Sequence, residues 1–345
     1  MGPVRPPIEP MLSKSASDIP EGKEWRYEPK WDGFRALIFR DGDDIQIISR
    51  KQTDLNRYFP ELLPVFAAGF PKQAVIDGEI IMVGERRLEF ETLQLRLHPA
   101  ASRVLKLSKE IPASFVAFDI LSRSTEDVRP LPLNERRILL TDSVGDVPSL
   151  CVTPQTADGD EARSWFTRFE GAGLDGVIAK RVDQPYRDGK RDWVKIKHQR
   201  TADCVAGGYR VAADGSGLGS LLLGLYDHAG VLHHVGHTSS FSAQEKREIL
   251  ETLELYRGDS GFSEGHGPGG PSRWSQGRNL EWVPVRPELV CEVGFEKLEG
   301  MRFRHASRFI RWRPDKEPRE CTYDQLEPPE DFDLASVVNL GRQTV

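Results

Sequence analysis

The sequence has few cysteines and no long apolar run. Four of its 345 residues are Cys and they share no CxxC spacing, so we expect reduced thiols rather than a zinc ribbon or a disulfide framework. No stretch approaches the roughly 18–20 apolar residues that cross a bilayer. The start, MGPVRPPIEPML, is too rich in proline for a signal peptide. These absences predict a cytoplasmic protein without a membrane segment.

An excess of positive charge is also missing. Lys and Arg together number 47 against 53 Asp and Glu, for a net charge of -6, which excludes a uniformly basic nucleic-acid coat. The basic residues nevertheless gather locally: residues 187–200 hold six Lys or Arg against two Asp, and residues 297–319 hold eight against three acids. Residues 320–345 hold six acids against one Arg. This pattern favours an anionic ligand held at one face, with a solvated charge run as the alternative.

Familiar nucleotide and metal motifs are absent or weak. The sequence contains no GxxxxGK[ST] loop, so a bound nucleotide would be held without one. Three glycines, 215, 217 and 219, lie between two expected strands, and we interpret them as a hairpin turn rather than a dinucleotide fingerprint. Four histidines (His228, His233, His234 and His237) are close in sequence. We expect His233 and His237 on one face of a strand and His234 on the other, which favours strand histidines over a zinc site.

The length predicts two domains. Residues 1–200 alternate short β-rich runs with helical stretches near 55–68, 91–97, 133–141 and 159–171, which is typical of an α+β domain built on antiparallel sheets. The expected β-rich runs lie at residues 36–39, 45–48, 75–76, 80–83, 115–121 and 176–179.

Residues 201–325 predict a second domain with five strands and one helix. The helix opens at Ser242 with Glu245 three residues later, a capping box, and a Gly- and Pro-rich loop follows at 264–272. A helix between the third and fourth of five strands is the order of the OB fold, a small β-barrel. Residues 326–345 form an acidic tail that we expect to be disordered or to lie on the surface.

A lysine fixed behind a proline marks the first candidate site, in the segment Glu28 to Arg35 (EPKWDGFR). Alone, this segment indicates a surface turn or an immobile amine nucleophile. The interpretation changes because further polar and basic motifs follow in order: residues 49–51 (SRK), 77–79 (DGE), 118–119 (FD), 175–180 (DGVIAK), 193–197 (WVKIK) and 313–316 (RPDK).

This ordered set resembles the covalent nucleotidyltransferases, the superfamily of DNA ligases, RNA ligases and mRNA capping enzymes, whose KxDGxR motif matches residues 30–35. The closing RPDK resembles the ATP-dependent DNA ligase form, and PPIEPML with YEPKWDGFRA resembles the actinobacterial C-type stand-alone ligases. The resemblance implies an adenylation (nucleotidyltransferase) domain followed by an OB-fold domain. It also implies that Lys30 attacks the α-phosphorus of ATP and becomes adenylylated.

The chemistry requires a deprotonated lysine. A free lysine amine is protonated at neutral pH unless nearby cations or desolvation lower its pKa. Lys195 and Lys197 alternate on one face of an expected strand, so we expect them to lower the pKa of Lys30 and to neutralise the α-phosphate. Asp32 is expected to orient the 3′ end or to bind metal.

The resemblance implies further ligands for ATP and for DNA. The complete set expected to hold the cofactor is Glu28, Lys30, Arg35, Arg50, Glu79, Phe118, Lys195, Lys197, Arg313 and Lys316. Phe118 resembles the aromatic that stacks on adenine, Glu79 the carboxylate that holds the ribose hydroxyls, and Glu28 the partner of the adenine amino group. The alternatives are core packing for Phe118 and a hairpin position for Glu79.

The cationic members have two expected roles. Arg35 and Arg50 resemble the pair that reads the 5′-phosphate at a nick; as isolated residues they would be exposed arginines in salt bridges. Arg313, Asp315 and Lys316 are expected to contact the pyrophosphate of ATP and then to move away.

Asp175 stands where the family usually has Glu. A hard cation such as Mg²⁺, or Mn²⁺ in its place, accepts either carboxylate, so Asp175 and Asp32 are the expected metal ligands; a plain turn at Asp175 is the alternative.

We therefore predict a monomeric ATP-dependent DNA ligase that acts on nicked duplex DNA, in repair and with repair proteins as possible partners. An RNA ligase or a guanylyltransferase with the same lysine chemistry is the alternative. A noncatalytic nucleic-acid binder is a third hypothesis, although it predicts loss of Lys30 or of the Lys195 and Lys197 pair, and all three are present.

Overall fold

The chain forms two compact units. The computed structural model describes residues 2–198, 200–212, 215, 217–259, 261–262, 267–268, 281–326 and 332–338. One unit contains the chain up to His198 together with the C-terminal segment that includes residues 332–338, and the other contains residues 199–328.

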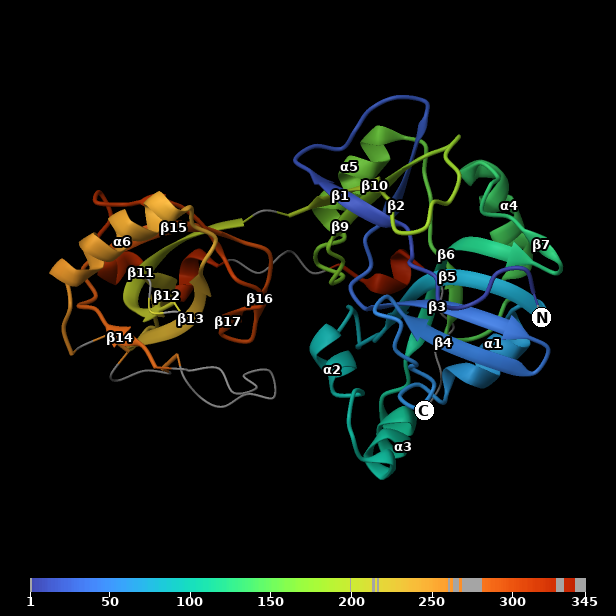
Figure 1. Cartoon of the computed structure of the whole chain (residues 1–345), viewed down its shortest axis with the longest axis horizontal. Coiled ribbons are helices and arrows are strands. Elements are labelled where there is room, and N and C mark those ends of the chain that lie inside the picture. The colour runs from blue at the N-terminus through green and yellow to red at the C-terminus, as the bar shows by residue number, and fades with distance from the viewer. Residues whose placement is uncertain are drawn as a thin grey trace. The chain divides into compact units, whose positions relative to one another are not determined.

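A six-stranded sheet forms the centre of the first unit (Figure 1). Its strand order is β4-β3-β5-β6-β7, and β8 pairs with β6 in parallel. These strands are β3 (Phe34–Asp41), β4 (Asp44–Ser49), β5 (Gln73–Ile81), β6 (Ser114–Arg123), β7 (Glu126–Asp127) and β8 (Leu150–Val152). β3 and β5 are antiparallel, with Arg35 opposite Glu79 and Leu37 opposite Asp77, so these four side chains share one face of the sheet.

Helices cover the other face of this sheet. Leu62 and Phe66 of one helix and Leu140 of another pack against alternating strand residues such as Ile38 and Ile76. The helices of this region are α1 (Leu62–Gly69), α2 (Phe90–Gln94), α3 (Ala101–Glu110) and α4 (Leu133–Ser143).

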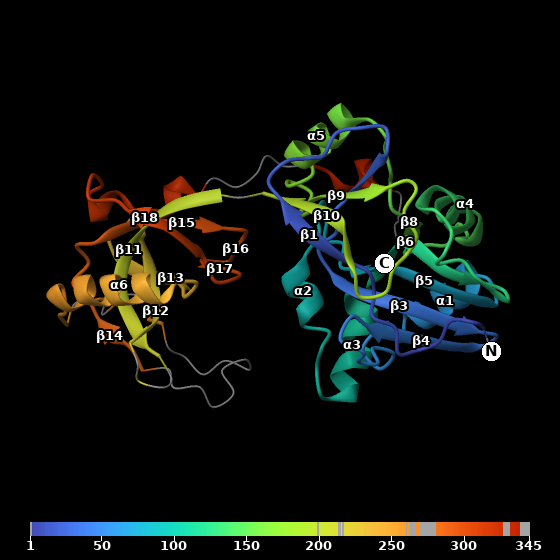
Figure 2. The same cartoon turned by 45° about the horizontal axis from the view of Figure 1, so that its top comes forward.

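A four-stranded sheet packs on the first face. Its order is β1-β10-β9-β2, antiparallel except for the β1 and β10 pair. Its strands are β1 (Leu12–Ala16), β2 (Trp25–Pro29), β9 (Gly176–Arg181) and β10 (Arg191–Lys197). Trp193 of this sheet packs with Leu37 and Leu121 of the larger sheet, and α5 (Gly159–Arg168) covers the outer face through Ala162. The unit is therefore layered as helices, six-stranded sheet, four-stranded sheet and α5 (Figure 2).

The second unit is a curled sheet with the order β13-β12-β11-β15-β18. Its strands are β11 (Arg200–Val211), β12 (Leu218–Tyr226), β13 (Leu232–Thr238), β14 (Val283–Pro284), β15 (Val290–Phe295), β16 (Leu298–Glu299), β17 (Arg302–Phe303) and β18 (Arg308–Trp312). A parallel bridge between Thr238 and Ser307 links the two edges. The strand order and this bridge match the OB fold that the sequence predicts, which is a partly open barrel.

The capping box that the sequence predicts is confirmed. Helix α6 (Ala243–Leu255) begins after Ser242, whose hydroxyl accepts from the Glu245 backbone, while the Glu245 side chain accepts from the Ser242 backbone. Gly215 and Gly217 lie in the β11–β12 hairpin with positive φ, as expected for a turn. The loop expected at 264–272 lies almost entirely outside the described residues.

The acidic tail returns to the first unit. Residues 332–338 include a 3₁₀ turn (Leu334–Ser336), and the Leu334 backbone N–H donates to the Arg86 carbonyl over 2.8 Å. Leu334 is buried beside Trp31 and Phe169. The acidic charge of residues 326–345 predicted a disordered or surface segment, whereas Phe332, Leu334, Val337 and Val338 pack in a core.

The α+β class and the antiparallel sheets are confirmed, whereas several element bounds differ. The helix expected at 55–68 begins at Leu62, after a turn around Pro60. Helix α3 was not predicted. No helix in the described ranges is long and apolar enough to cross a membrane.

Candidate active site

Two backbone hydrogen bonds fix Lys30 immediately after β2. Its N–H donates to the Gly176 carbonyl over 2.8 Å, and its carbonyl accepts from the Asp175 N–H over 2.9 Å. Gly176 has φ +130°, and a Cβ there would lie 2.1 Å from the Ile196 carbonyl oxygen, so this close approach requires glycine. The Lys30 side chain leaves this rigid frame and is 20% exposed.

The Lys30 ammonium meets an acid and a second cation. Lys30 Nζ donates to Asp175 Oδ2 over 2.8 Å, and Lys197 Nζ lies 3.6 Å from the same oxygen. Burial acts to lower the pKa of Lys30, but Asp175 outweighs it, with help from Glu79 and Asp32, and the pKa is raised. The sequence predicted that neighbouring cations would lower this pKa; the structure shows the opposite, because the nearest charged group is the Asp175 carboxylate.

Lys195 and Lys197 lie on the same face of β10, as predicted. Lys195 pairs with Ile178 of β9, which in turn pairs with Glu28 of β2. The register therefore places Lys195 and Glu28 in one row across the small sheet, on the face that meets the large one.

Glu79 and Asp32 bring two more carboxyl groups close to Lys30. Asp32 is 5% exposed and Glu79 is half-buried. Burial raises the pKa of Glu79 to about 8; Lys30 and Arg35 oppose this shift, and Asp32 and Asp77 add to it. Near neutral pH the Glu79 carboxyl is largely protonated, so it can both donate and accept a hydrogen bond, as a pair of sugar hydroxyls requires.

A β-bulge places Phe118. Asp77 pairs with Asp119 and the next residue, Gly78, pairs with Ala117, so Phe118 is the extra residue on β6. Phe118 is partly exposed, whereas its neighbours from Ala113 to Ser122 are buried. A bulge re-aims a side chain and is common beside active sites. The ring therefore has a surface that a planar ligand can cover, which core packing alone would not leave.

Arg35 is anchored by a buried acid. Its guanidinium donates to both oxygens of Asp77, over 3.0 and 2.6 Å, and the Tyr186 hydroxyl donates to Asp77 over 2.7 Å. Arg50 lies beside it, since the Arg50 N–H donates to the Arg35 carbonyl over 3.3 Å, and its side chain is exposed. The two arginines predicted to bind phosphate are therefore neighbours, but Arg35 pairs with a buried acid whereas the Arg50 side chain is exposed.

Glu28 lies in a network that includes two residues without a predicted role. The buried Glu28 carboxylate accepts from Gln155 Nε2 over 2.8 Å and pairs with Lys180 Nζ over 2.7 Å. Lys180 ends the motif at 175–180 and could have been identified by its alternation with Ile178. Gln155 carries no such signal, because it reaches Glu28 only through the bridge between Thr156 and Tyr27.

The motif RPDK lies in the second unit and forms ion pairs there. Arg313 pairs with Asp203 and with Asp315, each over 2.9 Å, and Lys316 pairs with Glu320 over 2.9 Å. Hydrogen bonds from Arg313 lower the pKa of Asp315 to about 2. These residues form a surface of alternating charge within their own unit.

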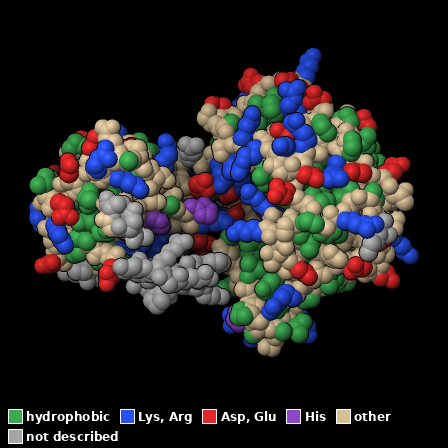
Figure 3. Space-filling model, viewed as in Figure 1, with side chains coloured by type: hydrophobic (Ala, Val, Ile, Leu, Met, Phe, Trp, Pro, Cys, Tyr) green, Lys and Arg blue, Asp and Glu red, His purple; other side chains and the backbone are tan. Residues whose placement is uncertain are grey.

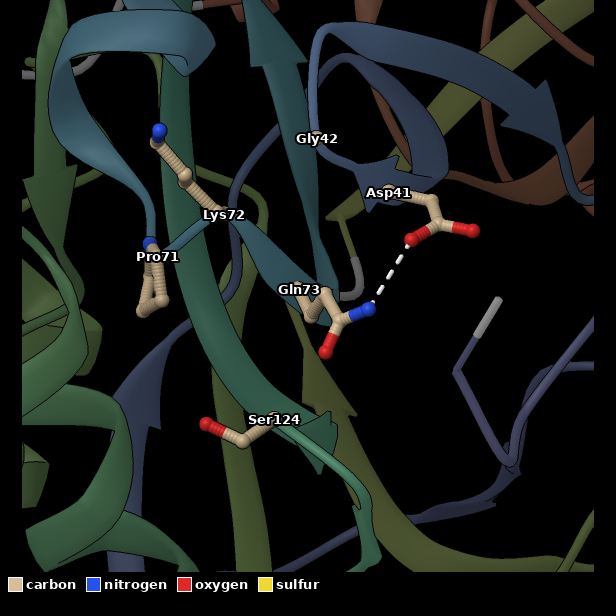
Figure 4. Close-up of a pocket in the computed structure, with 6 residues that line it drawn as sticks. All are labelled: Asp41, Gly42, Pro71, Lys72, Gln73 and Ser124. Carbon is tan, nitrogen blue, oxygen red and sulfur yellow. Dashed lines mark hydrogen bonds between the residues drawn. The ribbon is translucent and has the colours of Figure 1, made fainter.

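The basic island at 187–200 belongs largely to the small sheet. Lys and Arg side chains gather over β1 and β10 on the face seen in Figure 3. A surface pocket lined by Asp41, Gly42, Pro71, Lys72, Gln73 and Ser124 is shown in Figure 4. It lies at the opposite end of β3 and β5 from Arg35 and Glu79, so it is separate from the Lys30 site.

The four histidines do not form a metal centre. Within the part of the chain that the structure describes, no three His, Cys, Asp or Glu side chains are arranged to hold a metal. The expected alternation is wrong in detail: Leu223 pairs with Gly236 and Gly224 with His234, so a bulge at Val235 interrupts it. Burial lowers the pKa of both His234 and His237, and Arg210 acts on both in the same direction.

Comparisons with known proteins agree with this geometry. Residues 10–197 match the family model described as ATP dependent DNA ligase domain, and residues 214–316 match ATP dependent DNA ligase C terminal region. The chain is 47% identical over 346 residues to a Mycolicibacterium smegmatis protein named DNA ligase C1, covering 97% of this chain and 98% of that one. It is equally identical, over 356 residues and with the same coverage, to Mycobacterium tuberculosis DNA ligase C.

Two further proteins match this chain at lower sequence identity. A Mycobacterium tuberculosis protein named multifunctional non-homologous end joining DNA repair protein LigD is 30% identical over 305 residues, which are 87% of this chain and 37% of that protein. A solved structure from a study of Lig E DNA ligases aligns with a TM-score of 0.56 at 19% identity, covering 88% of this chain and 99% of that one. That alignment supports the fold.

Proposed function

This chain belongs to the ATP-dependent DNA ligases, and we propose that it seals nicks by carrying AMP on Lys30. The observation that carries this assignment of the nucleophile is the fixed position of Lys30, whose ammonium shares one Asp175 oxygen with Lys197. A nucleophile held in one geometry avoids the orientational cost of each encounter with substrate.

The proposed reaction has three transfers. Lys30 Nζ loses a proton and attacks the α-phosphorus of ATP, so that an N–P bond forms and the bond to pyrophosphate breaks. The 5′-phosphate of the nick then takes AMP from Lys30, and the 3′-hydroxyl finally attacks the 5′-phosphorus and releases AMP. In this scheme Lys195 and Lys197 neutralise the α-phosphate, and Asp32 orients the 3′ end.

Nucleotide selection is assigned to three positions. Phe118 stacks on adenine with the ring face that its bulge exposes, and Glu79 binds the ribose hydroxyls as both donor and acceptor. Glu28 accepts from the adenine amino group; Gln155 and Lys180 already hold its carboxylate in place. Guanine would present a carbonyl oxygen to this carboxylate, which favours ATP over GTP.

Asp175 and Asp32 fit a magnesium ion that also binds the phosphates of ATP. Mg²⁺ prefers oxygen ligands and is usually held by one or two carboxylates together with substrate phosphates, and Mn²⁺ accepts the same donors. Both aspartates lie close to Lys30, and Asp175 is 18% exposed. The metal would supply positive charge to the reacting phosphate oxygens.

Nicked DNA would be held by arginines of the first unit and by the basic surface over β1 and β10. Arg35 and Arg50 bind the 5′-phosphate, and Arg313 and Lys316 contact pyrophosphate during adenylylation of Lys30. We propose that a monomer suffices for this reaction, and that the enzyme works in the cytoplasm, where bacterial chromosomal DNA lies. A role in repair is supported by the similarity to LigD.

The experiment that tests this function offers nicked duplexes with DNA or RNA on either side of the nick, with ATP and Mg²⁺. We expect sealing of all-DNA nicks that carry a 5′-phosphate and no sealing of nicks that lack it. Preferential sealing of all-RNA duplexes would contradict the proposal. Repair can be tested separately on duplexes with short complementary overhangs, where end joining is expected.

A further inference from the structure

Trp193 lies on the catalytic face of β10. Side chains alternate along a strand, so Trp193, Lys195 and Lys197 point to the same side, while Val194 and Ile196 pack under α5. Trp193 is only 4% exposed. Trp193 is therefore a buried aromatic residue on the face of β10 that also carries Lys195 and Lys197.

Two cations, the buried Lys180 and the partly buried Arg35, lie over this indole. The guanidinium carbon of Arg35 lies 4.9 Å from the ring centroid, and Lys180 Nζ lies 4.2 Å from it. The same two cations lie 5.3 and 4.9 Å from the ring of Phe118. Phe118 meets Trp193 edge to face, with 5.9 Å between centroids and 85° between planes. Two aromatic rings and two cations thus form one packed group.

Each of the two cations also forms an ion pair with a buried acid. Asp77 pairs with Arg35 and Glu28 pairs with Lys180, and both acids are at most 2% exposed. The Tyr186 ring also meets Trp193 edge to face, with 6.0 Å between ring centroids and 80° between ring planes. Cation–π contacts are strongest where water is excluded. Loss of the indole would therefore free Arg35, Lys180 and Phe118 to change position.

We propose that Trp193 is a positioning residue that sets the affinity for ATP by holding Phe118 and the Glu28 and Lys180 pair in place. The proposal rests on the proposed function, in which Phe118 and Glu28 receive adenine. Lys30 does not depend on this group for its own position, because Gly176 and Asp175 fix its backbone. Trp193 should therefore act on binding of the nucleotide more than on transfer of AMP.

The test measures the rate of lysyl-AMP formation as a function of ATP concentration in the full-length enzyme. In Trp193→Leu, the ATP concentration for half-maximal rate should rise about tenfold, the combined effect of two partly buried cation–π contacts. The maximal rate should stay within about twofold, since Lys30 is held elsewhere. Trp193→Phe keeps an aromatic face and should recover most of the affinity.

The matched control is Trp25→Leu. Trp25 also carries a cation, Arg181 at 5.9 Å, and lies on β2 of the same sheet, away from Phe118. This variant should leave the affinity for ATP unchanged. A loss of maximal rate with unchanged affinity in Trp193→Leu, or equal effects in both variants, would overturn the proposal.

A double-mutant cycle gives a second, independent readout. If Trp193 acts through Phe118, Trp193→Met, which keeps a large apolar side chain without an aromatic face, and Phe118→Leu together should weaken ATP binding less than the sum of their separate effects, and additive effects would count against it. This cycle also applies if Trp193→Leu does not fold. Failure of the proposed function is distinguishable, because the wild-type enzyme would then form no lysyl-AMP at all.

Discussion

Lys30 combines a fixed backbone with a charged side chain that must lose its proton before it can react. The backbone of Lys30 is held by Asp175 and Gly176. Asp175, which also accepts a hydrogen bond from the Lys30 amine, lies 145 residues away in the sequence. The same Asp175 carboxylate raises the pKa of the amine. In the proposed reaction, one residue thus positions Lys30 and also keeps its amine protonated until ATP enters.

This coupling predicts the pH dependence of adenylylation. A raised pKa means that the neutral amine becomes abundant only at alkaline pH, so the rate of lysyl-AMP formation should rise with pH. Asp175→Asn removes the charge that raises the pKa, and the rising limb should move to lower pH. The rate should be measured from about pH 6 to about pH 10. Asp183→Asn is the control, since Asp183 pairs only with Arg181 at the surface among the described ion pairs; a rising limb that does not move in Asp175→Asn would refute the coupling.

The two arginines near the nick phosphate should behave differently. Arg50 is exposed, so Arg50→Ala should slow sealing about tenfold or more while lysyl-AMP formation stays nearly unchanged. Arg35 also stacks on Phe118, so Arg35→Ala should impair both steps. Gel assays of AMP incorporation and of nick sealing separate the two effects. Equal losses of labelling in both variants would be inconsistent with this assignment.

Motifs in the sequence predicted which residues lie together around Lys30, but not which charges lie nearest to its amine. Lys30, Asp175, Lys195 and Lys197 were predicted as one site, and the structure brings Lys30, Asp175 and Lys197 together. The direction of the pKa shift of Lys30 could not be predicted, because it depends on which charge is nearest. That order follows from the pairing of β2 with β9, which sequence distance does not reveal.

At the scale of the element, β6 shows how a local irregularity creates a binding surface. Its pattern of nearly continuous apolar residues predicts a buried strand, and the strand is buried except at Phe118 and at its last residue, Arg123. The bulge depends on Gly78, where a Cβ would lie 2.2 Å from the Phe115 ring and 2.4 Å from the Val116 carbonyl. A period-2 pattern cannot predict such an extra residue.

The C-terminal segment is the element that sequence composition described least well. Leu334 is 2% exposed and packs with Trp31, the residue after Lys30, and the Phe332 ring contacts Phe169 at a tilt of 38°, with 5.4 Å between centroids. Seven residues of an acidic tail therefore support the loop that carries the nucleophile. A segment of seven residues is too short for its apolar positions to show a reliable period.

Removal of this anchor should destabilise the first unit. Leu334→Ala should lower its free energy of unfolding by about 3 kcal/mol, as for other buried leucines. Leu255→Ala is the matched control, because Leu255 is 76% exposed, and it should change stability by less than about 0.5 kcal/mol. Urea unfolding followed by tryptophan fluorescence measures both. Equal stability of the two variants would show that the tail is not part of the core.

For the whole molecule, the order of the motifs predicted the family and the order of the two domains. Only the structure shows which strands pair with one another. The α+β class and the helix at Ser242 followed from local patterns. The four-stranded sheet did not, because β1 and β10 pair across almost 180 residues, with Leu12 opposite Arg191. The net charge of -6 likewise concealed a basic surface over β1 and β10.

The central claim is that Lys30 is the residue that carries AMP. The most direct measurement incubates the full-length enzyme with Mg²⁺ and α-labelled ATP or α-labelled GTP, then separates protein from free nucleotide under denaturing conditions. The account predicts label from ATP in the wild type, little or none from GTP, and none from either in Lys30→Ala. Label that persists in Lys30→Ala, or that comes from GTP in preference to ATP, would contradict it.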